Sequence, residues 1–372
     1  MPDASTSFDR QMMAIALAMA RRGLGRTAPN PSVGAVIADE TTGEVIARGW
    51  TQPGGRPHAE TQAIARAGER TRGATIYVTL EPCSHHGKTP PCADAIIAAG
   101  FKRAVVGTLD PDPRVSGRGM RMLRAAGIEV TRGVLVDEAH RMARGHILRV
   151  TERRPLVQLK MALDADGHVP QGANGQPVWV TGPDARAHGH ILRAKADAIL
   201  VGSGTVRDDD PELTCRLPGL SARSPIRVVL AGTELPSPTA KLVRTAREIP
   251  VWLFAGEARK LASLPQLVEA GVRCFDVASV DGRPWLPAVL EALVAEGITR
   301  LLVEGGAGIW RAFLSQRLAD EVYLYQPLAG GDAVARARTA LQSFEPAGAN
   351  SQFTLANVRD VGPDRVHVFR RT

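Results

Sequence analysis

The sequence has few cysteines, few aromatic residues and no long apolar run. Four cysteines in 372 residues are too few for the disulfide framework of a small secreted domain. No run of 18 apolar residues occurs, and the polar start MPDASTSFDR lacks an apolar signal core. We therefore expect no membrane span and a cytoplasmic, reducing location, where neighbouring cysteines indicate a metal site or catalysis.

The low aromatic content also bears on partners. Aromatic residues make up 4% of the chain, whereas readers of single-stranded nucleic acid stack bases on aromatic rings. Lys and Arg number 46 against 38 Asp and Glu, a formal net charge of +8, and this charge is spread along the chain. The balance favours phosphorylated metabolites or nucleotides as partners, and we expect no nucleic acid.

Length and patterning predict two α/β domains. At roughly 150 residues per domain, 372 residues suggest two or three domains, and 44% hydrophobic and 23% charged residues are ordinary globular values. Strand-like and helix-like runs alternate in both halves. The charged segment TERRP at 151–155 is the predicted boundary, which gives domains 1–150 and 151–372.

The expected elements are as follows. Helical patterns occur at 8–22, 59–67, 92–99, 118–126, 137–150, 184–195, 264–270, 286–296 and 309–317. β-rich runs occur at 33–38, 44–48, 74–80, 102–107, 128–131, 156–161, 198–201, 227–231, 250–254, 300–303 and 321–325, and an antiparallel edge is expected from 353–358 and 365–370. The strand at 198–201 is expected to enter a turn, GSGT.

The strongest chemical signal is the ordered set HAE, PC and PC. A hydrolytic zinc site takes three protein ligands and leaves the fourth position to water, and His58, Cys83 and Cys92 supply that number. Glu60 follows His58 by two residues at the start of a helix, where it can move protons without binding the metal. The alternative is a structural zinc, for which His85 or His86 could supply a fourth ligand.

Three segments of this half resemble a known family. APNPSVGAVI (28–37), PHAETQAI (57–64) and VTLEPCSHHGKTPPCADAII (78–97) are similar to the deaminase half of the bifunctional deaminase–reductases of riboflavin biosynthesis, the RibD family. The eight residues between the two cysteines separate this pattern from cytidine and tRNA adenosine deaminases, which have two. The resemblance implies a cytidine-deaminase-like α/β/α sandwich with Zn²⁺, and substrate contacts at Asn30 and Lys88.

The segment WVTGPDARAHGHILRAKADAILVGSGTVRDDDPELTCR (179–216) resembles the reductase half of the same family. This implies a dihydrofolate-reductase-like α/β domain that uses NADPH. The implied cofactor-binding residues are Leu163, Trp179, Thr205, Asp209, Gly306, Ala307, Gly308 and Ile309. The implied substrate-binding residues are Arg193, Leu213, Arg216 and Glu304, of which the two arginines would hold a ribose 5-phosphate, and Lys160 is an expected proton donor.

Two glycine-rich segments support the predicted cofactor site independently of the resemblance. Two strand-like runs lead into GSGT (202–205) and GGAG (305–308). Glycine lets a backbone approach a phosphate closely, and a helix that follows offers N–H donors. Each cluster alone is more typical of a tight turn, and GSGTVR lacks the third glycine of the Rossmann fingerprint.

Three positions depart from the family pattern. Thr51 stands where a substrate-contacting His is usual, Asp164 where Ser is usual, and Pro177 where a substrate-touching Ser is common. We expect the zinc chemistry to survive the first change. The other two leave open a deaminase whose reductase half is weakened.

The resemblance implies a bifunctional enzyme that acts on a phosphorylated ribosylaminopyrimidine, first as deaminase and then as reductase, and we expect a homo-oligomer. Two further alternatives remain at this point. One is a nucleic-acid (tRNA) deaminase with an appended module, which would bind RNA in a salt-sensitive way. The other is a zinc-stabilised binding protein with a dead site, against which the presence of Glu60 argues.

Overall fold

The protein is described from a computed structural model that covers residues 6–86, 90–169, 180–232, 234–256, 264–328, 332–346 and 351–372. The chain divides into two compact units, Met1–Arg154 and Pro155–Thr372. The dividing point falls inside the TERRP segment. Among the described residues, no helix is both long and apolar enough to cross a membrane.

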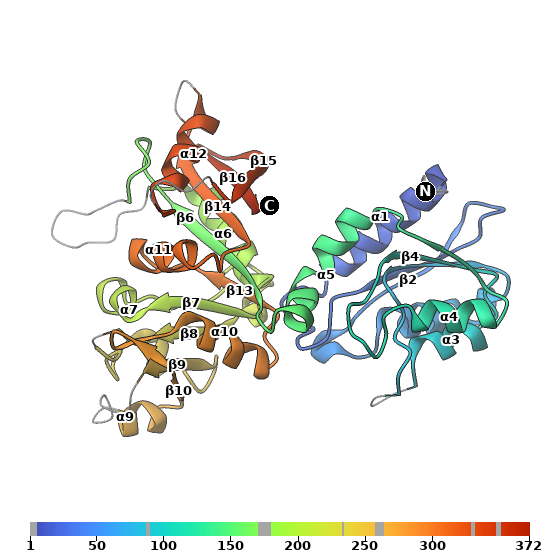
Figure 1. The fold of residues 1–372 in the computed structure, drawn as a ribbon, viewed down its shortest axis with the longest axis horizontal. Helices are drawn as coiled ribbons and strands as arrows, with labels where there is room; N and C mark the ends of the chain where they lie inside the picture. Colours follow the sequence, from blue (N-terminus) through green and yellow to red (C-terminus); the bar gives the residue numbers. More distant parts are fainter. Residues whose placement is uncertain are drawn as a thin grey trace. The chain divides into compact units, whose positions relative to one another are not determined.

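The first unit is a five-stranded sheet between helices (Figure 1). Its elements are α1 (Ser7–Arg21), β1 (Gly34–Ala38), β2 (Val45–Trp50), α2 (Ala59–Ala67), β3 (Thr75–Leu80), α3 (Cys92–Ala98), β4 (Arg103–Thr108), α4 (Arg118–Ala125), β5 (Glu129–Arg132) and α5 (Val136–Thr151), with short 3₁₀ turns at Pro53–Gly55 and Gly68–Thr71. The strand order is β2-β1-β3-β4-β5. Strands β3, β4 and β5 are parallel, and β1 is antiparallel to both of its neighbours.

Alternation along the strands explains the layers of this unit. Ile76 and Val78 of β3 pack in one apolar cluster with residues of α2, α3 and α4, whereas Tyr77 packs in another with residues of α1. Successive side chains of a strand point to opposite faces, so a sheet with apolar residues at every position needs helices on both sides. The α/β/α sandwich expected from the sequence is therefore present.

Helix α1 shows how the local sequence sets an element. Thr6 accepts a hydrogen bond from the Asp9 N–H at 3.0 Å, and the Asp9 carboxylate accepts one from the Thr6 N–H, which is a capping box. Asp9 is also fully buried against Arg103 of β4, with Oδ1 2.8 Å and Oδ2 3.0 Å from its guanidinium. One residue thus begins the helix and ties it to the sheet.

The second unit is built on a nine-stranded sheet. Its larger elements are β6 (Leu156–Ala162), α6 (Pro183–Ala194), β7 (Ala198–Gly202), α7 (Ser203–Asp209), β8 (Ile226–Leu230), α8 (Lys241–Arg244), β9 (Val251–Gly256), α9 (Leu264–Glu269), β10 (Arg273–Val277), α10 (Leu286–Ala295), β13 (Arg300–Val303), α11 (Ala307–Ser315), β14 (Glu321–Pro327), α12 (Ala333–Gln342), β15 (Phe353–Val361) and β16 (Asp364–Arg371). A small ribbon joins β11 (Ser279–Val280) to β12 (Arg283–Pro284), and a 3₁₀ turn spans Ser221–Arg223.

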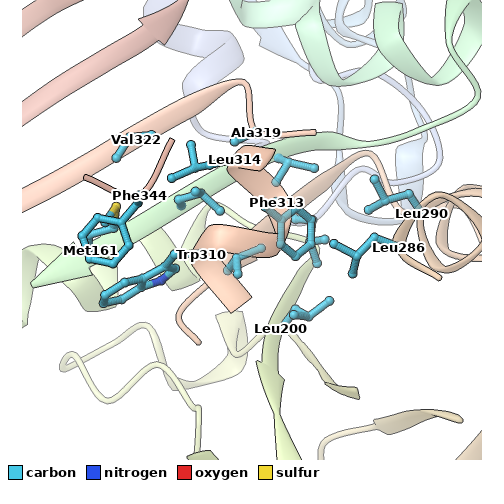
Figure 2. Packing of buried hydrophobic residues seen from close by; sticks show 14 of the residues in the cluster. Met161, Leu200, Leu286, Leu290, Trp310, Phe313, Leu314, Ala319, Val322 and Phe344 are labelled. Atoms are coloured by element: carbon cyan, nitrogen blue, oxygen red, sulfur yellow. The ribbon is translucent and has the colours of Figure 1, made fainter. Parts of the chain in front are cut away.

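The strand order in this sheet is β10-β9-β8-β7-β13-β6-β14-β16-β15. All pairs from β10 to β14 are parallel, and β16 and β15 add antiparallel to that edge, as the sequence predicts. Figure 2 shows the core on one face, where Trp310, Phe313 and Leu314 of α11 lie near Met161 and Leu200 of the sheet. The other face packs against α6 to α9 through a second cluster.

Helices α7, α8 and α12 and strand β10 were not predicted from the sequence. Their sequences mix apolar with polar or charged residues and show no clear period, and packing stabilises the three helices. Val206 of α7, Leu242 of α8 and Ala337 of α12 are each almost fully buried in the two clusters of this unit. The predicted turn at GSGT is wrong in part, because Ser203–Thr205 form the first turn of α7.

Candidate active sites

The first pocket lies at one end of the strands of the five-stranded sheet. Parallel strands β3 and β4 both end there, and β1 begins there because it runs antiparallel to β3. The loops beyond these strand ends meet, which is where α/β proteins usually bind ligands. The pocket is lined by Pro29, Asn30, Pro31, Val33, Thr51, Arg56, His58, Glu60, Leu80, Glu81, Cys83, His85, Asp110, Asp112, Arg114, Val115, His146 and Arg149.

The three expected metal ligands come together in this pocket. His58 Nδ1 lies 3.3 Å from Cys92 Sγ and 3.8 Å from Cys83 Sγ, and the ligand atoms all lie within 4.8 Å of one another. With Zn–N near 2.0 Å and Zn–S near 2.3 Å, a tetrahedral centre has N···S edges of about 3.6 Å. The spacing and the His/Cys donor set therefore fit Zn²⁺, and the described residues bring no fourth His, Cys, Asp or Glu ligand into the group.

Hydrogen bonds and burial set the pKa values of the two cysteine thiols. Cys92 is the first residue of α3, and its N–H donates to Cys83 Sγ at 3.2 Å. The hydrogen bond from the Cys92 thiol, followed by that from His58, lowers the pKa of Cys83 to about 4 despite burial. The pKa of the Cys92 thiol is raised by the same hydrogen bond and by burial. Because zinc binds thiolate, metal binding must displace the proton that Cys92 retains.

Glu60 lies beside the ligands. It is 4% exposed and lies in the first turn of α2, two residues after His58, which is the N-cap residue of that helix. Burial, together with the negative charge of Cys83, raises the pKa of its carboxyl to about 7. A carboxyl with a pKa near neutrality can both accept and release a proton, which is the property of a general acid–base group.

Asn30 and Thr51 line the same pocket with different hydrogen bonds. Asn30 Nδ2 donates to the Gly55 carbonyl at 2.9 Å. Gly55 has φ +82°, and a Cβ there would lie 2.6 Å from Asn30 Nδ2, so this contact requires glycine. Thr51 accepts a hydrogen bond from the Val33 N–H at 3.0 Å and is buried. Its hydroxyl therefore accepts a hydrogen bond from the backbone just before β1. Lys88 lies outside the described residues.

The second pocket, in the other unit, is strongly basic. It is lined by Lys160, Arg186, Gly189, His190, Arg193, Arg216 and Glu304. Arg193 of α6 forms a two-point ion pair with Glu304, with Nε–Oε1 2.9 Å and Nη2–Oε2 2.8 Å. Burial would raise the pKa of Glu304, but the charge and hydrogen bonds of Arg193, with the charge of Lys160, lower it to about 2. Burial lowers the pKa of Lys160.

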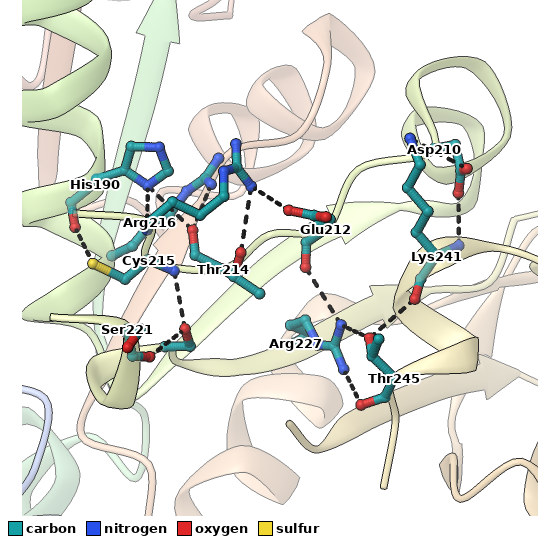
Figure 3. Close-up of polar contacts among 12 residues, drawn as sticks. His190, Asp210, Glu212, Thr214, Cys215, Arg216, Ser221, Arg227, Lys241 and Thr245 are labelled. Carbon is teal, nitrogen blue, oxygen red and sulfur yellow. Dashed lines mark hydrogen bonds and ion pairs between the residues drawn. The ribbon is translucent and has the colours of Figure 1, made fainter. Parts of the chain in front are cut away.

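The loop after α7 carries Arg216 to this pocket (Figure 3). Arg216 Nη1 lies 2.9 Å from Glu212, and the Thr214 carbonyl accepts a hydrogen bond from Arg193 Nη1 at 3.0 Å. Leu213 between them has φ +56° and is buried, so its side chain packs in the core beneath the loop. Arg193 thus joins Glu304 to the loop that carries Arg216.

A fully buried Arg227 supports the base of this loop. Its guanidinium donates to the Thr245 side chain at 2.8 Å, to the Thr245 carbonyl at 3.0 Å, to the Ile249 carbonyl and to the Glu212 carbonyl at 3.4 Å (Figure 3). Burial lowers its pKa to about 10. Sequence patterns give no sign of this role, because Arg227 lies inside a β-rich run.

The glycine-rich segments have two different explanations. A Cβ at Gly305 would lie 2.8 Å from Ile309, and one at Gly202 would lie 3.3 Å from the same side chain, so both glycines permit close packing. A Cβ at Gly306 or Gly308 would meet nothing within 4 Å. The backbone at the start of α11 is therefore open, and a helix N-terminus of this kind suits a phosphate.

The remaining expected cofactor residues differ in their access to a ligand. Thr205 and Asp209 lie four residues apart on α7, and so on one face of it. Leu163 is fully buried in the core, so only its backbone can approach a cofactor. Asp164 accepts hydrogen bonds from the N–H groups of Asp166 and His168 at 3.0 and 2.8 Å and thereby forms a turn. Trp179 and Pro177 lie outside the described residues.

Two family models match the two halves of the chain in turn. A family model described as "Cytidine and deoxycytidylate deaminase zinc-binding region" matches residues 6–108, and one described as "RibD C-terminal domain" matches residues 155–366. The chain is 39% identical to the riboflavin biosynthesis protein RibD of Escherichia coli over 96% of this chain and 97% of the relative. It is 37% identical to that of Aquifex aeolicus over 98% and 99%.

The chain belongs to the RibD family.

Solved RibD structures show the same fold. A structure of Acinetobacter baumannii RibD superposes with a TM-score of 0.82 at 34% identity, over 98% of this chain and 99% of that one. A Thermotoga maritima structure gives the same values, and its printed name is diaminohydroxyphosphoribosylaminopyrimidine deaminase/5-amino-6-(5-phosphoribosylamino)uracil reductase. The predicted fold class is thereby confirmed.

RibD membership also confirms the predicted enzyme class. The protein is a bifunctional deaminase and reductase of riboflavin biosynthesis, with a zinc-binding deaminase domain and a RibD reductase domain that depends on NADPH. The sequence reasoning missed several pocket residues: Arg56, Asp110, Asp112, Arg114, His146, Arg149, Arg186 and His190. Polar residues directly after the buried strand β4 (DPDPR) were an available signal for three of them.

Proposed function

We propose that the first unit deaminates 2,5-diamino-6-ribosylamino-4(3H)-pyrimidinone 5′-phosphate and that the second reduces the ribosyl side chain of the product to ribityl. The observation that carries the proposal is the group of His58, Cys83 and Cys92, at 3.3 and 3.8 Å, with Glu60 buried beside it. The same chain carries a basic pocket suited to a phosphorylated sugar.

In the deaminase half, His58, Cys83 and Cys92 hold Zn²⁺. Bound zinc supplies an activated water, whose pKa falls to about 7. Glu60 accepts a proton from that water at its carboxylate and delivers it to the amino group on the pyrimidine carbon. The water oxygen forms a bond to that carbon and the C–N bond breaks, so that the amino group leaves as ammonia and the carbon becomes a carbonyl. Asn30 and Lys88 contact the substrate, for which the Asn30 amide offers both a donor and an acceptor.

In the reductase half, Arg193 and Arg216 hold the 5-phosphate, and Leu213 and Glu304 complete the substrate pocket. Arg193 uses three of its five N–H donors on Glu304 and Thr214, which leaves two for a phosphate. Trp179, Thr205, Asp209, the backbone of Leu163 and the open start of α11 at Gly306, Ala307, Gly308 and Ile309 hold NADPH. NADPH supplies the hydride to C1′ of the ribosyl group, and Lys160 donates a proton to the sugar.

The domain assignment is residues 1–150 for the deaminase and 151–372 for the reductase. A homo-oligomeric state, the absence of nucleic-acid partners and a cytoplasmic location stay predictions. They are open to analytical ultracentrifugation, salt-dependent RNA binding and cell fractionation respectively.

The test is a coupled assay on purified protein whose zinc content has been measured. Ammonia release and NADPH oxidation are followed separately with the diaminopyrimidine phosphate, with Glu60→Gln as control. Wild type is expected to show both signals and the variant neither, because its reductase receives no substrate. Adding the deaminated intermediate must restore NADPH oxidation to the variant.

Two results would change the proposal. Ammonia without NADPH oxidation would indicate a reductase weakened at Asp164 or Pro177. No ammonia from zinc-loaded protein would overturn the proposed substrate and direct the search to nucleic acids.

A further inference from the structure

His146 is a buried imidazole in the first pocket that the proposed chemistry leaves without a role. It lies on α5, is 8% exposed and lines the pocket with the metal ligands. Its Nε2 lies 3.0 Å from Oδ1 of Asp110. Asp110 follows β4, is 7% exposed and lines the same pocket. The contact therefore joins a helix to a pocket loop.

The Asp110 carboxylate is held by one of its two oxygens. Oδ1 accepts the hydrogen bond from His146 and another from the Asp112 N–H at 2.9 Å. Within the described ranges, both hydrogen bonds of this carboxylate end on Oδ1. Oδ2 is consequently the oxygen left for a ligand in the pocket.

The other ring nitrogen of His146 shows that packing alone does not account for a histidine here. A carboxylate only accepts hydrogen bonds, so Nε2 must carry the proton. Nδ1 is buried and has no hydrogen-bond partner among the described residues. A buried polar atom without a partner costs free energy that an apolar side chain of similar size would avoid.

Apolar residues of α5 other than His146 pack this helix against its neighbours. Ala139 packs in the cluster with α1, and Ala143 packs in the cluster on the opposite face of the sheet, both through apolar contacts. The contact that only a hydrogen-bond donor at position 146 can make is the one to Asp110.

We propose that His146 is a positioning residue of the deaminase half: it fixes Asp110 so that Oδ2 accepts a hydrogen bond from a hydroxyl or amino group of the bound phosphoribosyl pyrimidine. The proposal rests on the deaminase function proposed above. His146 acts on substrate affinity through Asp110 and takes no part in proton transfer at the reacting carbon, which belongs to Glu60.

The test compares two variants of similar length, His146→Gln and His146→Met, in zinc-loaded full-length protein. Gln keeps a donor close to the place of Nε2, and Met does not. For His146→Met we expect a KM for deamination raised about tenfold with kcat within twofold, as for the loss of one charge-assisted hydrogen bond. For His146→Gln we expect most of the wild-type KM. Zinc content and reductase activity on the deaminated intermediate should stay unchanged in both.

Two further measurements separate positioning from a merely structural role. In an Asp110→Ala background, His146→Met should raise KM no further. Nitrogen NMR of ¹⁵N-histidine-labelled protein should show one imidazole, absent in His146→Gln, that is protonated at Nε2, and its signals should shift in Asp110→Ala.

Equal KM values for the Met and Gln variants would overturn the proposal, as would a His146→Met effect that persists in Asp110→Ala or an imidazole without a proton at Nε2. Failure of the wild type to release ammonia from this substrate would instead refute the proposed function. The NMR result would then still decide whether His146 holds Asp110.

Discussion

The metal group of the first pocket comes from a short span of sequence, whereas the basic second pocket comes from a long one. The metal ligands and Glu60 lie between residues 58 and 92, at a strand end and at the starts of two helices. The residues of the basic pocket are drawn from β6, α6, the loop after α7 and the end of β13, from Lys160 to Glu304. A metal centre demands ligands at short fixed distances, which favours a compact motif, whereas a phosphate pocket needs only converging charge.

The pockets also hold their buried charges differently. In the first, Glu60 has no arginine partner among the contacts described for it, and burial raises its pKa to about 7. In the second, Arg193 pairs with Glu304 and lowers the pKa of that carboxyl to about 2. The first arrangement leaves a proton free to move, and the second keeps a carboxylate permanently charged.

The largest effect is expected at the metal ligands. Cys83→Ser should lose bound zinc and at least a thousandfold in deamination, because removal of one of three ligands leaves too few for the metal. Reduction of the deaminated intermediate should be unchanged. Zinc analysis and the two separate assays measure these outcomes, with Cys274→Ser, on β10, as the matched control. Zinc retained at wild-type level in Cys83→Ser would contradict the role of Cys83 as a metal ligand.

Next comes the buried ion pair of the reductase pocket. Glu304→Gln should reduce the free energy of unfolding by about 3–5 kcal/mol and abolish reduction, because it leaves the Arg193 guanidinium buried without its counterion. Urea denaturation followed by tryptophan fluorescence measures the loss, and Trp252 and Trp310 are buried tryptophans in the core of this unit. The matched control, Glu296→Gln, removes the partner of the half-exposed Arg273 and should cost at most about 1 kcal/mol. Equal losses in the two variants would contradict the contrast.

A smaller effect is expected for Arg216, which is half-exposed and paired with Glu212. Arg216→Gln should raise the KM of reduction about tenfold through the lost phosphate contact and leave stability almost unchanged. The control is Arg244→Gln, on α8 outside the pocket. Inorganic phosphate should inhibit wild type competitively and the Arg216 variant less. An unaltered KM would remove Arg216 from the proposed phosphate site.

The smallest effect concerns acid stability of the first unit. Burial would raise the pKa of Asp9, but the hydrogen bonds of Arg103, of the Thr6 N–H and of Tyr77 outweigh it and lower that pKa. A carboxyl with a lowered folded pKa contributes stability that is present above its unfolded value, near 4, and is lost as pH falls toward the folded value. Asp9→Asn should therefore be less stable than wild type at pH 7 by about 1 kcal/mol. The difference should shrink below pH 4 in urea titrations; a constant difference would exclude this ionisation as the cause.

The fold class and the grouping of the proposed zinc ligands were predictable from sequence because local rules govern them. Apolar period-2 and period-3.6 patterns give most strands and helices, and the HAE, PC and PC motifs lie directly at the helix starts that place them. Helices α7 and α12 escaped because their sequences lack a clear apolar stripe and their stability comes from tertiary packing of a few residues such as Val206 and Ala337. Pocket residues such as Asp110 and Arg186 escaped because their neighbours in space are distant in sequence.

The sequence by itself therefore determined the two α/β halves, the metal donor set and the chemical class of each reaction. Only the tertiary structure decided that Glu60 is buried beside the ligands, that Arg193 is held by Glu304, and that His146 reaches Asp110. The physical reason is that donor type and periodicity are properties of neighbouring residues, whereas burial, charge pairing and pKa depend on which strand ends and helices meet.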